Sequence, residues 1–270
     1  LLSGPRVLIM DNPFIGLDAG TRDLLKSLLD ELIRVIGLQV ILVLSKSDDI
    51  PAFVTHVITV EDMTCGTKIP RQEYEGVKVP ASMLSEEKRK AILELPYKDN
   101  QYNAENVVRL NKVSIRYGER TILRDLDWTV KCGEKWALSG ENGAGKSTLL
   151  SLVCADNPQS YACDITLFDR KRGSGESIWE IKKHIGYVSP EMHRAYLKNI
   201  PAIDIVARGL HDSIGLYKRP KEEDREVCLF WMDVFGVKEL ADRSFLQLSS
   251  GEQRLVLLAR AFVKDPELLI

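Results

Sequence analysis

A glycine-rich loop followed by a lysine and two hydroxyl side chains is the segment best suited to chemistry. Residues 140–148 read GENGAGKST and fit the pattern G-x-x-x-x-G-K-[ST]. The glycines let backbone N–H groups turn toward phosphate oxygens, and a helix beginning at Lys146 adds the positive end of its dipole. Lys146 would neutralise the β- and γ-phosphates, and Ser147 would offer its hydroxyl to Mg²⁺. The pattern therefore predicts a site for a nucleotide triphosphate with Mg²⁺.

A second segment, Leu248–Gln253, reads LSSGEQ and heads an amphipathic helix over Arg254–Val263. By itself it is a common helix N-cap, but it follows the glycine-rich loop by about a hundred residues. In that position it resembles the signature L-S-G-G-Q of the ATP-binding cassette (ABC) ATPases. Ser250 in place of the middle glycine and Glu252 before Gln253 are departures from that pattern. A serine hydroxyl and a helix N-terminus there would face a γ-phosphate held by another cassette.

Three further segments extend the resemblance to nearly the whole chain. Tyr117 matches the aromatic residue that stacks on adenine in ABC proteins. Leu8–Pro13 resembles the Walker B strand with its acidic end, and Gly16–Asp18 resembles the D-loop that follows it. The resemblance implies an α/β P-loop NTPase with a mostly parallel core sheet, an antiparallel β subdomain and a helical subdomain that carries the signature. It also implies ATP binding, coupled in the full-length protein to ATP hydrolysis.

Other runs are similar to soluble tandem double-cassette ATPases of the ModF type, known as molybdate-transport ATP-binding and photorepair proteins. These runs are Asp156–Tyr161, Leu167–Phe168, Arg172–Glu176 and Ile185–Glu191. Molybdate itself does not follow, because no oxyanion site is evident beyond the glycine-rich loop.

Two positions depart from an active ABC site. Asn12 stands where a glutamate normally polarises the attacking water, and an amide cannot accept the proton. Ser45 stands where the switch histidine is expected. Asn12 could also simply cap the turn before Pro13, with Asp11 still a sound Mg²⁺ ligand. The glutamine of the Q-loop is absent as well, and Ser189, Pro190 or Glu191 occupies that turn.

The resemblance assigns roles to a set of residues. Asn12 and Ser45 take the two altered catalytic positions, and Ser147 and Asp11 take the metal positions. The remaining residues are assigned to ATP: Tyr117, Gly140, Asn142, Gly143, Ala144, Gly145, Lys146, Ser147, Thr148, Ser249, Ser250, Gly251 and Gln253.

Apolar periodicity places these motifs on elements. Val7–Met10 and Gln39–Leu44 are typical of buried parallel strands, and the helix between them has Asp18 or Thr21 as N-cap and Gly37 at its end. Trp136–Ser139 is expected to be the strand that leads into the glycine-rich loop. His56–Met63 and Lys68–Val79 favour weaker antiparallel strands.

The order of the motifs predicts parts of two cassettes. Pro5–Ile9 aligns with Pro266–Ile270 at an offset of 261 residues (266 − 5), which indicates one period of a tandem repeat. We expect residues 1–80 to be the C-terminal part of one cassette, 81–105 a linker, and 106–270 the N-terminal and helical parts of the next. Each ATP site would then be shared between cassettes. In the alternative, slightly favoured for the isolated chain, 1–80 and 106–266 pack as one permuted cassette.

Composition excludes several classes. A net charge of −2 argues against a dedicated nucleic-acid binder, and no apolar run is long enough to span a bilayer. Five scattered cysteines without C-x-x-C spacing indicate reduced thiols in the cytoplasm and no zinc site. Three alternatives to an ATP-hydrolysing cassette remain. These are a MgATP-binding switch with little turnover, the ATPase subunit of a membrane importer with a permease partner, and, last, a ribosome-acting tandem cassette.

Overall fold

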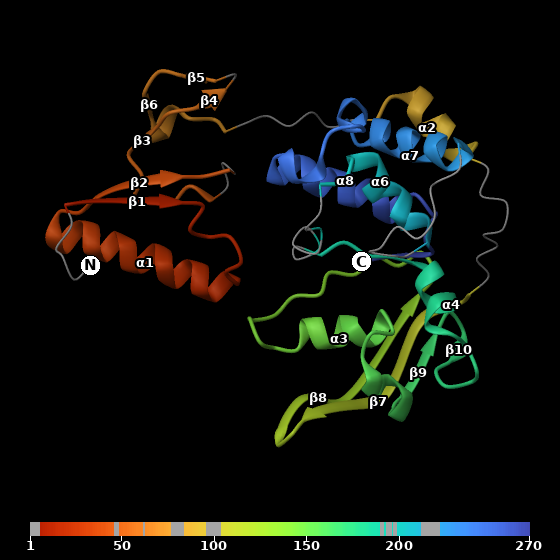
Figure 1. The fold of residues 1–270 in the computed structure, drawn as a ribbon. Helices are drawn as coiled ribbons and strands as arrows, with labels where there is room; N and C mark the ends of the chain where they lie inside the picture. Colours follow the sequence, from red (N-terminus) through yellow and green to blue (C-terminus); the bar gives the residue numbers. More distant parts are fainter. Residues whose placement is uncertain are drawn as a thin grey trace. The chain divides into compact units, whose positions relative to one another are not determined.

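The computed structural model describes residues 6–45, 49–61, 63–76, 84–95, 104–189, 192, 196, 199–211 and 222–270. The chain forms two compact units. Unit 1 comprises residues 1–83 and 139–144, and unit 2 comprises residues 84–138 and 145–270. Figure 1 shows the elements of both units along the chain.

Unit 1 is built on a β–α–β segment. Strand β1 (Val7–Asp11) and strand β2 (Gln39–Val43) pair in parallel, and helix α1 (Ala19–Ile36) connects them (Figure 1). Asp18 caps α1 by accepting from the Thr21 N–H, and Gly37 ends the helix with a φ of 63°. Both predicted ends of the helix are therefore confirmed.

Two short antiparallel pairs complete unit 1. Strand β3 (His56–Val57) pairs with β6 (Ile69–Pro70), and β4 (Val60–Glu61) pairs with β5 (Thr64–Cys65). A short 3-10 helix, η2 (Arg71–Glu73), follows β6. The predicted strands over His56–Met63 and Lys68–Val79 are thus shorter than expected, and residues 77–79 lie outside the described part.

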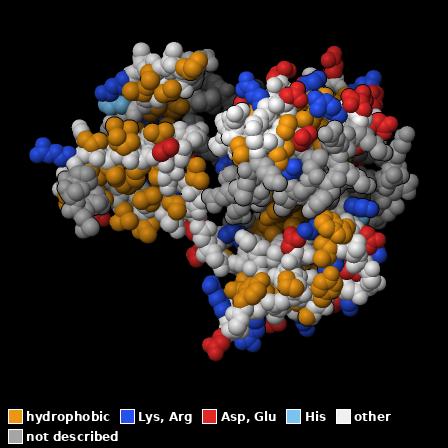
Figure 2. Space-filling model, viewed as in Figure 1, with side chains coloured by type: hydrophobic (Ala, Val, Ile, Leu, Met, Phe, Trp, Pro, Cys, Tyr) orange, Lys and Arg blue, Asp and Glu red, His pale blue; other side chains and the backbone are white. Residues whose placement is uncertain are grey.

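The core of unit 1 is small. Among its described residues the buried hydrophobic side chains are Phe14, Leu29 and Leu38. The two strands pair in parallel as predicted, but the prediction that both are buried is wrong, because Ile9 of β1 is 66% exposed and Ile41 of β2 is 52% exposed. Figure 2 shows hydrophobic side chains gathered on the visible surface of this unit.

Unit 2 begins with a charged helix and an antiparallel sheet. Helix α2 (Glu86–Leu93) is capped by Ser85. The sheet has the strand order β10-β9-β7-β8. Its strands are β7 (Asn106–Tyr117), β8 (Arg120–Lys131), β9 (Asp164–Leu167) and β10 (Arg170–Lys171). Helix α3 (Lys146–Val153) and the 3-10 helix η3 (Pro158–Ala162) lie between β8 and β9 in the chain. Leu152 and Val153 of α3 share a buried cluster with side chains of β7 and β9.

The second half of unit 2 is mainly helical. Helix α4 (Ile178–Lys183) leads to β11 (Ile185–Gly186), which pairs in parallel with β12 (Leu268–Leu269). The helical elements that lie between β11 and β12 in the chain pack around a second, separate cluster of buried hydrophobic side chains. These elements are α6 (Ala202–Ala207), η4 (Arg208–His211), α7 (Glu222–Val234), η5 (Lys238–Leu240), η6 (Phe245–Gln247) and α8 (Ser250–Phe262). Pro201 is the N-cap residue of α6.

The strand predicted over Trp136–Ser139 does not form in the structure. Trp136 is 58% exposed and Leu138 is 44% exposed. A strand needs a neighbour to accept and donate its ladder hydrogen bonds, and no strand of the described chain pairs with this segment. An apolar run before a glycine-rich loop was therefore not sufficient to produce the strand.

None of the described helices is both long enough and apolar enough to cross a membrane.

Candidate nucleotide-binding site

The glycine-rich loop runs across the boundary between the units, since Ala144 belongs to unit 1 and Gly145 to unit 2. Gly143 and Gly145 have φ values of 85° and 95°, in the region that favours glycine. A Cβ on Gly145 would lie 3.0 Å from Ile122 Cγ2 and 3.2 Å from Leu123 Cδ2. The turn into α3 therefore requires a glycine for both its conformation and its close packing on β8.

Helix α3 begins at Lys146 with Gly145 as its N-cap. The first N–H groups of a helix have no partner within the helix, so they point toward whatever lies before it. Leu149 and Leu152 are buried and fix the helix against the sheet, whereas Ser147 at its start is exposed. The arrangement offers backbone donors, one lysine and one hydroxyl to an anion.

Within unit 1 the N-terminal half of the loop contacts the segment that precedes α1. The backbone N–H of Asn142 donates to Asp18 Oδ2 at 3.1 Å, and Asn142 Nδ2 donates to the carbonyl oxygen of Gly16 at 3.1 Å. Asp18 uses its other oxygen to cap α1. The D-loop-like residues Gly16–Asp18 thus meet the loop, a contact between residues over 120 positions apart that sequence reasoning missed.

Asn12 and Ser45, the two altered catalytic positions, bond to each other. The Asn12 Oδ1 atom accepts from the Ser45 backbone N–H at 3.0 Å and from Ser45 Oγ at 2.8 Å. Asn12 Nδ2 donates to Asp11 Oδ1 at 2.8 Å, and the Asn12 N–H donates to the Val43 carbonyl at 2.8 Å. Asn12 has a φ of 45°, a conformation that asparagine tolerates better than most residues. The Asn12–Ser45 hydrogen bonds therefore link the segments that directly follow β1 and β2.

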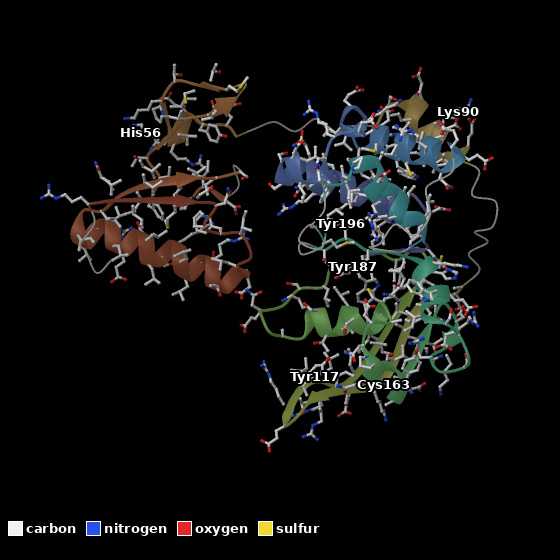
Figure 3. The ribbon with its side chains drawn as sticks, in the orientation of Figure 1. His56, Lys90, Tyr117, Cys163, Tyr187 and Tyr196 are labelled. Carbon is white, nitrogen blue, oxygen red and sulfur yellow. The ribbon has the colours of Figure 1, made fainter. Side chains whose placement is uncertain are left out.

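Tyr117 lies at the end of β7, where the hairpin turns to β8 (Figure 3). Its side chain is 52% exposed, so a planar ligand can reach the ring. Its hydroxyl accepts from Asn157 Nδ2 at 3.1 Å. The residue is therefore both accessible and tethered.

The signature-like segment forms a capping box at the start of α8. Ser249 Oγ accepts from the Glu252 N–H, and Glu252 Oε2 accepts from the Ser249 N–H at 2.7 Å. The bonds from the backbone N–H and then the hydroxyl of Ser249 hold the pKa of Glu252 below its ordinary value. Gln253 Nε2 donates to the Phe245 carbonyl at 2.9 Å. Glu252, a departure from the signature, thus completes the cap at the N-terminus of α8. Ser250 and Gly251 occupy the first turn of α8.

The metal and Q-loop positions are only partly described. Asp11 ends β1 in unit 1 and Ser147 begins α3 in unit 2, so the two predicted Mg²⁺ ligands belong to different units. Ser189 is described, whereas Pro190 and Glu191 lie outside the described residues. Among the described residues, no group of three or more His, Cys, Asp or Glu side chains is placed so that it could hold a metal ion.

Comparison with known proteins decides the family. The sequence profile described as ABC transporter matches residues 123–270, more than half of the chain. The chain belongs to the ABC transporter family of ATP-binding proteins. Its fold is that of a P-loop NTPase, and the ATP-binding domain is the part of the family that the chain contains.

Individual relatives agree with this assignment. This ABC chain is 41% identical to the ABC transporter ATP-binding protein ModF of Escherichia coli, with all of the chain and 56% of ModF aligned. It is 28% identical to an uncharacterized ABC transporter ATP-binding protein of Schizosaccharomyces pombe, over all of the chain and 55% of that protein. The chain thus spans about half the length of these curated relatives.

A solved structure supports the fold alone. The cbiO1 protein of Clostridium perfringens, part of the ABC transporter complex cbiONQ, superposes with a TM-score of 0.51 at 23% sequence identity. The superposition covers 61% of this ABC chain and 64% of cbiO1.

Proposed function

We propose that this chain binds MgATP through residues 140–148, with Tyr117 against the adenine. The observation that carries the proposal is the turn at Gly145, whose positive φ and packing on Ile122 set the start of α3 behind the loop. Such a helix start is a natural phosphate site. Lys146 would neutralise phosphate charge, and Ser147 would offer its hydroxyl to Mg²⁺, whereas Asp11 would be the Mg²⁺ ligand in the site of its own cassette.

We also propose that the chain holds parts of two cassettes, with residues 1–80 from one, 81–105 as a linker and 106–270 from the next. The separate pairing of the two similar strands favours this division, because β1 pairs with β2 and β12 pairs with β11. Each ATP site of the full-length protein would combine the loop of one cassette with the signature segment 248–253 of another. A second cassette is then the first partner to expect, and a permease remains a further candidate. Because ATP is a cytoplasmic metabolite, we place the activity in the cytoplasm.

A second candidate function is a MgATP-binding switch that hydrolyses little. The bonds between Asn12 and Ser45 favour it, because neither side chain can take a proton from water at neutral pH. Hydrolysis in the full-length protein would then depend on the other composite site.

Ligand-linked thermal unfolding tests the binding proposal. MgATP at a hundred times its dissociation constant should raise the melting temperature of unit 2 by about 5–10 °C. Lys146→Ala should remove the rise, whereas Lys183→Ala, a lysine at the end of α4, should keep it. A rise that survives Lys146→Ala would count against the proposed site.

Phosphate release separates the two candidate functions. If the chain is a MgATP-binding switch, the wild-type chain should release phosphate at a rate close to that of Lys146→Ala. Clear Lys146-dependent turnover by the wild-type chain would instead favour the ATP-hydrolysing function.

A further inference from the structure

The segment Asp156–Tyr161 is one of the runs that resemble tandem cassettes, and the proposed function gives it no role. In the structure it follows α3 and forms η3. Asn157, which caps η3, is only 4% exposed although its side chain is polar. A buried amide is retained at little cost only when its hydrogen bonds are satisfied, so its partners indicate what it does.

Both ends of the Asn157 side chain are engaged. Its Nδ2 group donates to Tyr117 Oη at 3.1 Å and to Ser151 Oγ at 3.2 Å. Its Oδ1 atom accepts from the Gln159 N–H at 3.0 Å. Since an amide nitrogen has two hydrogens, the donors of Asn157 are fully used by these two bonds.

The bonds continue to the start of α3. Ser151 Oγ donates to the carbonyl oxygen of Thr148 at 2.7 Å. Thr148 is the last residue of the glycine-rich loop motif. A continuous series of hydrogen bonds therefore runs from the phenol of Tyr117 through Asn157 and Ser151 to the first turn of α3.

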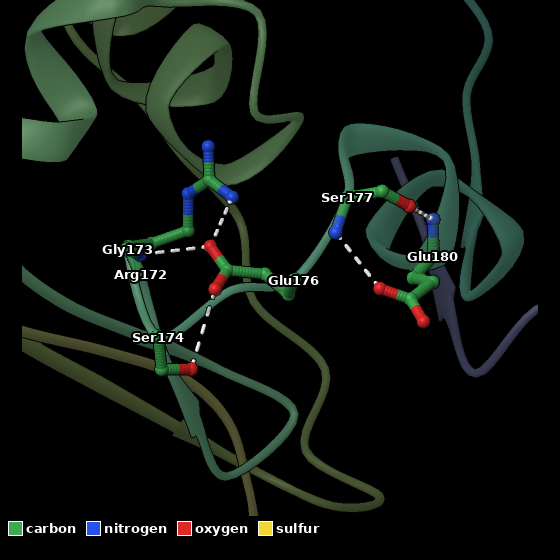
Figure 4. A network of polar contacts seen from close by, with 6 residues as sticks. All are labelled: Arg172, Gly173, Ser174, Glu176, Ser177 and Glu180. Carbon is green, nitrogen blue, oxygen red and sulfur yellow. Dashed lines mark hydrogen bonds and ion pairs between the residues drawn. The ribbon is translucent and has the colours of Figure 1, made fainter.

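A second tether holds the same strand end. Gln159 Nε2 donates to the Arg116 carbonyl at 3.0 Å, next to Tyr117 in the chain. From the other side of η3, the guanidinium of Arg172 lies 4.5 Å from the centre of the Tyr161 ring. Arg172 is itself fixed by a buried ion pair with Glu176 at 2.6 Å (Figure 4). The run Arg172–Glu176 thus contacts the run Asp156–Tyr161, which in turn bonds to the end of β7 that carries Tyr117.

We propose that Asn157 is a positioning residue for the adenine subsite, which holds the Tyr117 ring in a fixed relation to the phosphate-binding start of α3. The proposal rests on the proposed binding of MgATP. A half-exposed tyrosine otherwise exchanges among rotamers, and fixing it before the ligand arrives removes part of the entropy cost of binding. Asn157 itself does not contact the nucleotide.

The test compares MgATP with magnesium tripolyphosphate, which has the phosphates but no base, by calorimetric titration. Tyr117→Phe keeps the ring and removes only the hydroxyl that Asn157 holds. It should weaken MgATP binding about fivefold, the effect of one neutral hydrogen bond, and leave tripolyphosphate binding unchanged. Asn157→Ala should act in the same direction.

The double variant completes the test. With Tyr117→Phe already present, Asn157→Ala should weaken MgATP binding by little more, because both changes remove the same bond. Ser114→Ala is the matched control, because Ser114 lies on β7 like Tyr117 and bonds only to Asp125 of β8 through its hydroxyl in the described chain. Both affinities should stay as in the wild type.

Failure of the inference and failure of the proposed function give different results. If Lys146→Ala abolishes MgATP binding but Tyr117→Phe leaves it unchanged, the positioning role is wrong and the binding site stands. Equal losses for MgATP and tripolyphosphate in Tyr117→Phe, or fully additive losses in the double variant, would likewise overturn the positioning role. If MgATP binds equally well to Lys146→Ala, the proposed function itself fails.

Discussion

The pair Asn12–Ser45 shows how two single-residue departures can depend on each other. From the sequence, each appeared as a separate loss of a catalytic group. In the structure one amide oxygen accepts both the N–H and the hydroxyl of Ser45. The contact could not be deduced from spacing, because it needs β1 and β2 to pair so that their ends meet.

Asn12→Ala should therefore lower the stability of unit 1. It removes the acceptor for Ser45 and places alanine at a φ of 45°, and together these effects cost about 1–3 kcal/mol. Urea unfolding followed by hydrogen exchange of β1 and β2 measures the loss. Ser45→Ala, which removes only the hydroxyl bond, should cost less. A larger loss of stability in Ser45→Ala than in Asn12→Ala would contradict the argument that the Asn12 side chain and backbone contribute most to this contact.

The ionisation of a single carboxylate, that of Glu176, should make the stability of unit 2 depend on pH. Burial opposes its ionisation, but the Gly173 N–H, the Arg172 guanidinium and Ser174 outweigh burial and lower its pKa. A lowered pKa in the folded state means that this contribution is fully present above the unfolded pKa of about 4.3 and is lost as pH falls through the folded value.

Glu176→Gln should thus destabilise unit 2 by about 3 kcal/mol at pH 7, because it leaves Arg172 buried without its counter-ion. It should also make stability fall less steeply with acid below about pH 4.5. Denaturant unfolding at several pH values provides the measurement, with the exposed Glu119→Gln as control. An unchanged acid slope in Glu176→Gln would contradict the argument.

At the scale of elements, local signals were reliable and long-range ones were not. Asp18 and Gly37 end α1 where predicted, because caps act over a few residues. Trp136–Ser139 failed as a strand, since pairing depends on a neighbour elsewhere in the chain. The contacts between η3 and the end of β7 at Tyr117 could not be predicted from the sequence either, because the two segments are far apart in the chain. A turn-rich run such as Asn157–Gln159 could nevertheless be used as a signal for a segment that contacts an aromatic strand end.

The capping box of α8 yields a prediction for an element. Ser249→Ala removes the bond that satisfies the Glu252 N–H and should lower the melting temperature of unit 2 by about 2–4 °C, equivalent to about 1 kcal/mol. Differential scanning calorimetry measures this shift. Ser250→Ala, one residue further into the helix, should change the temperature by less, and a reversed order would show that the cap is not at Ser249.

At the scale of the whole molecule, the two units differ in how much they bury. Unit 1 has Phe14, Leu29 and Leu38 as buried hydrophobic side chains among its described residues, whereas unit 2 has two extensive clusters. Local stability follows buried apolar contact. Amides of β1 and β2 should therefore exchange with solvent faster than those of β7 and β8. Equal protection would show that the exposed face of unit 1 is covered in solution.

The central claim is that residues 140–148 bind MgATP. The most direct measurement is a calorimetric titration of MgATP into the wild-type chain and into Lys146→Ala, with Lys183→Ala as control. The account predicts saturable binding to the wild type and to Lys183→Ala, and its loss in Lys146→Ala. Absence of binding to the wild type, or undiminished binding to Lys146→Ala, would contradict it.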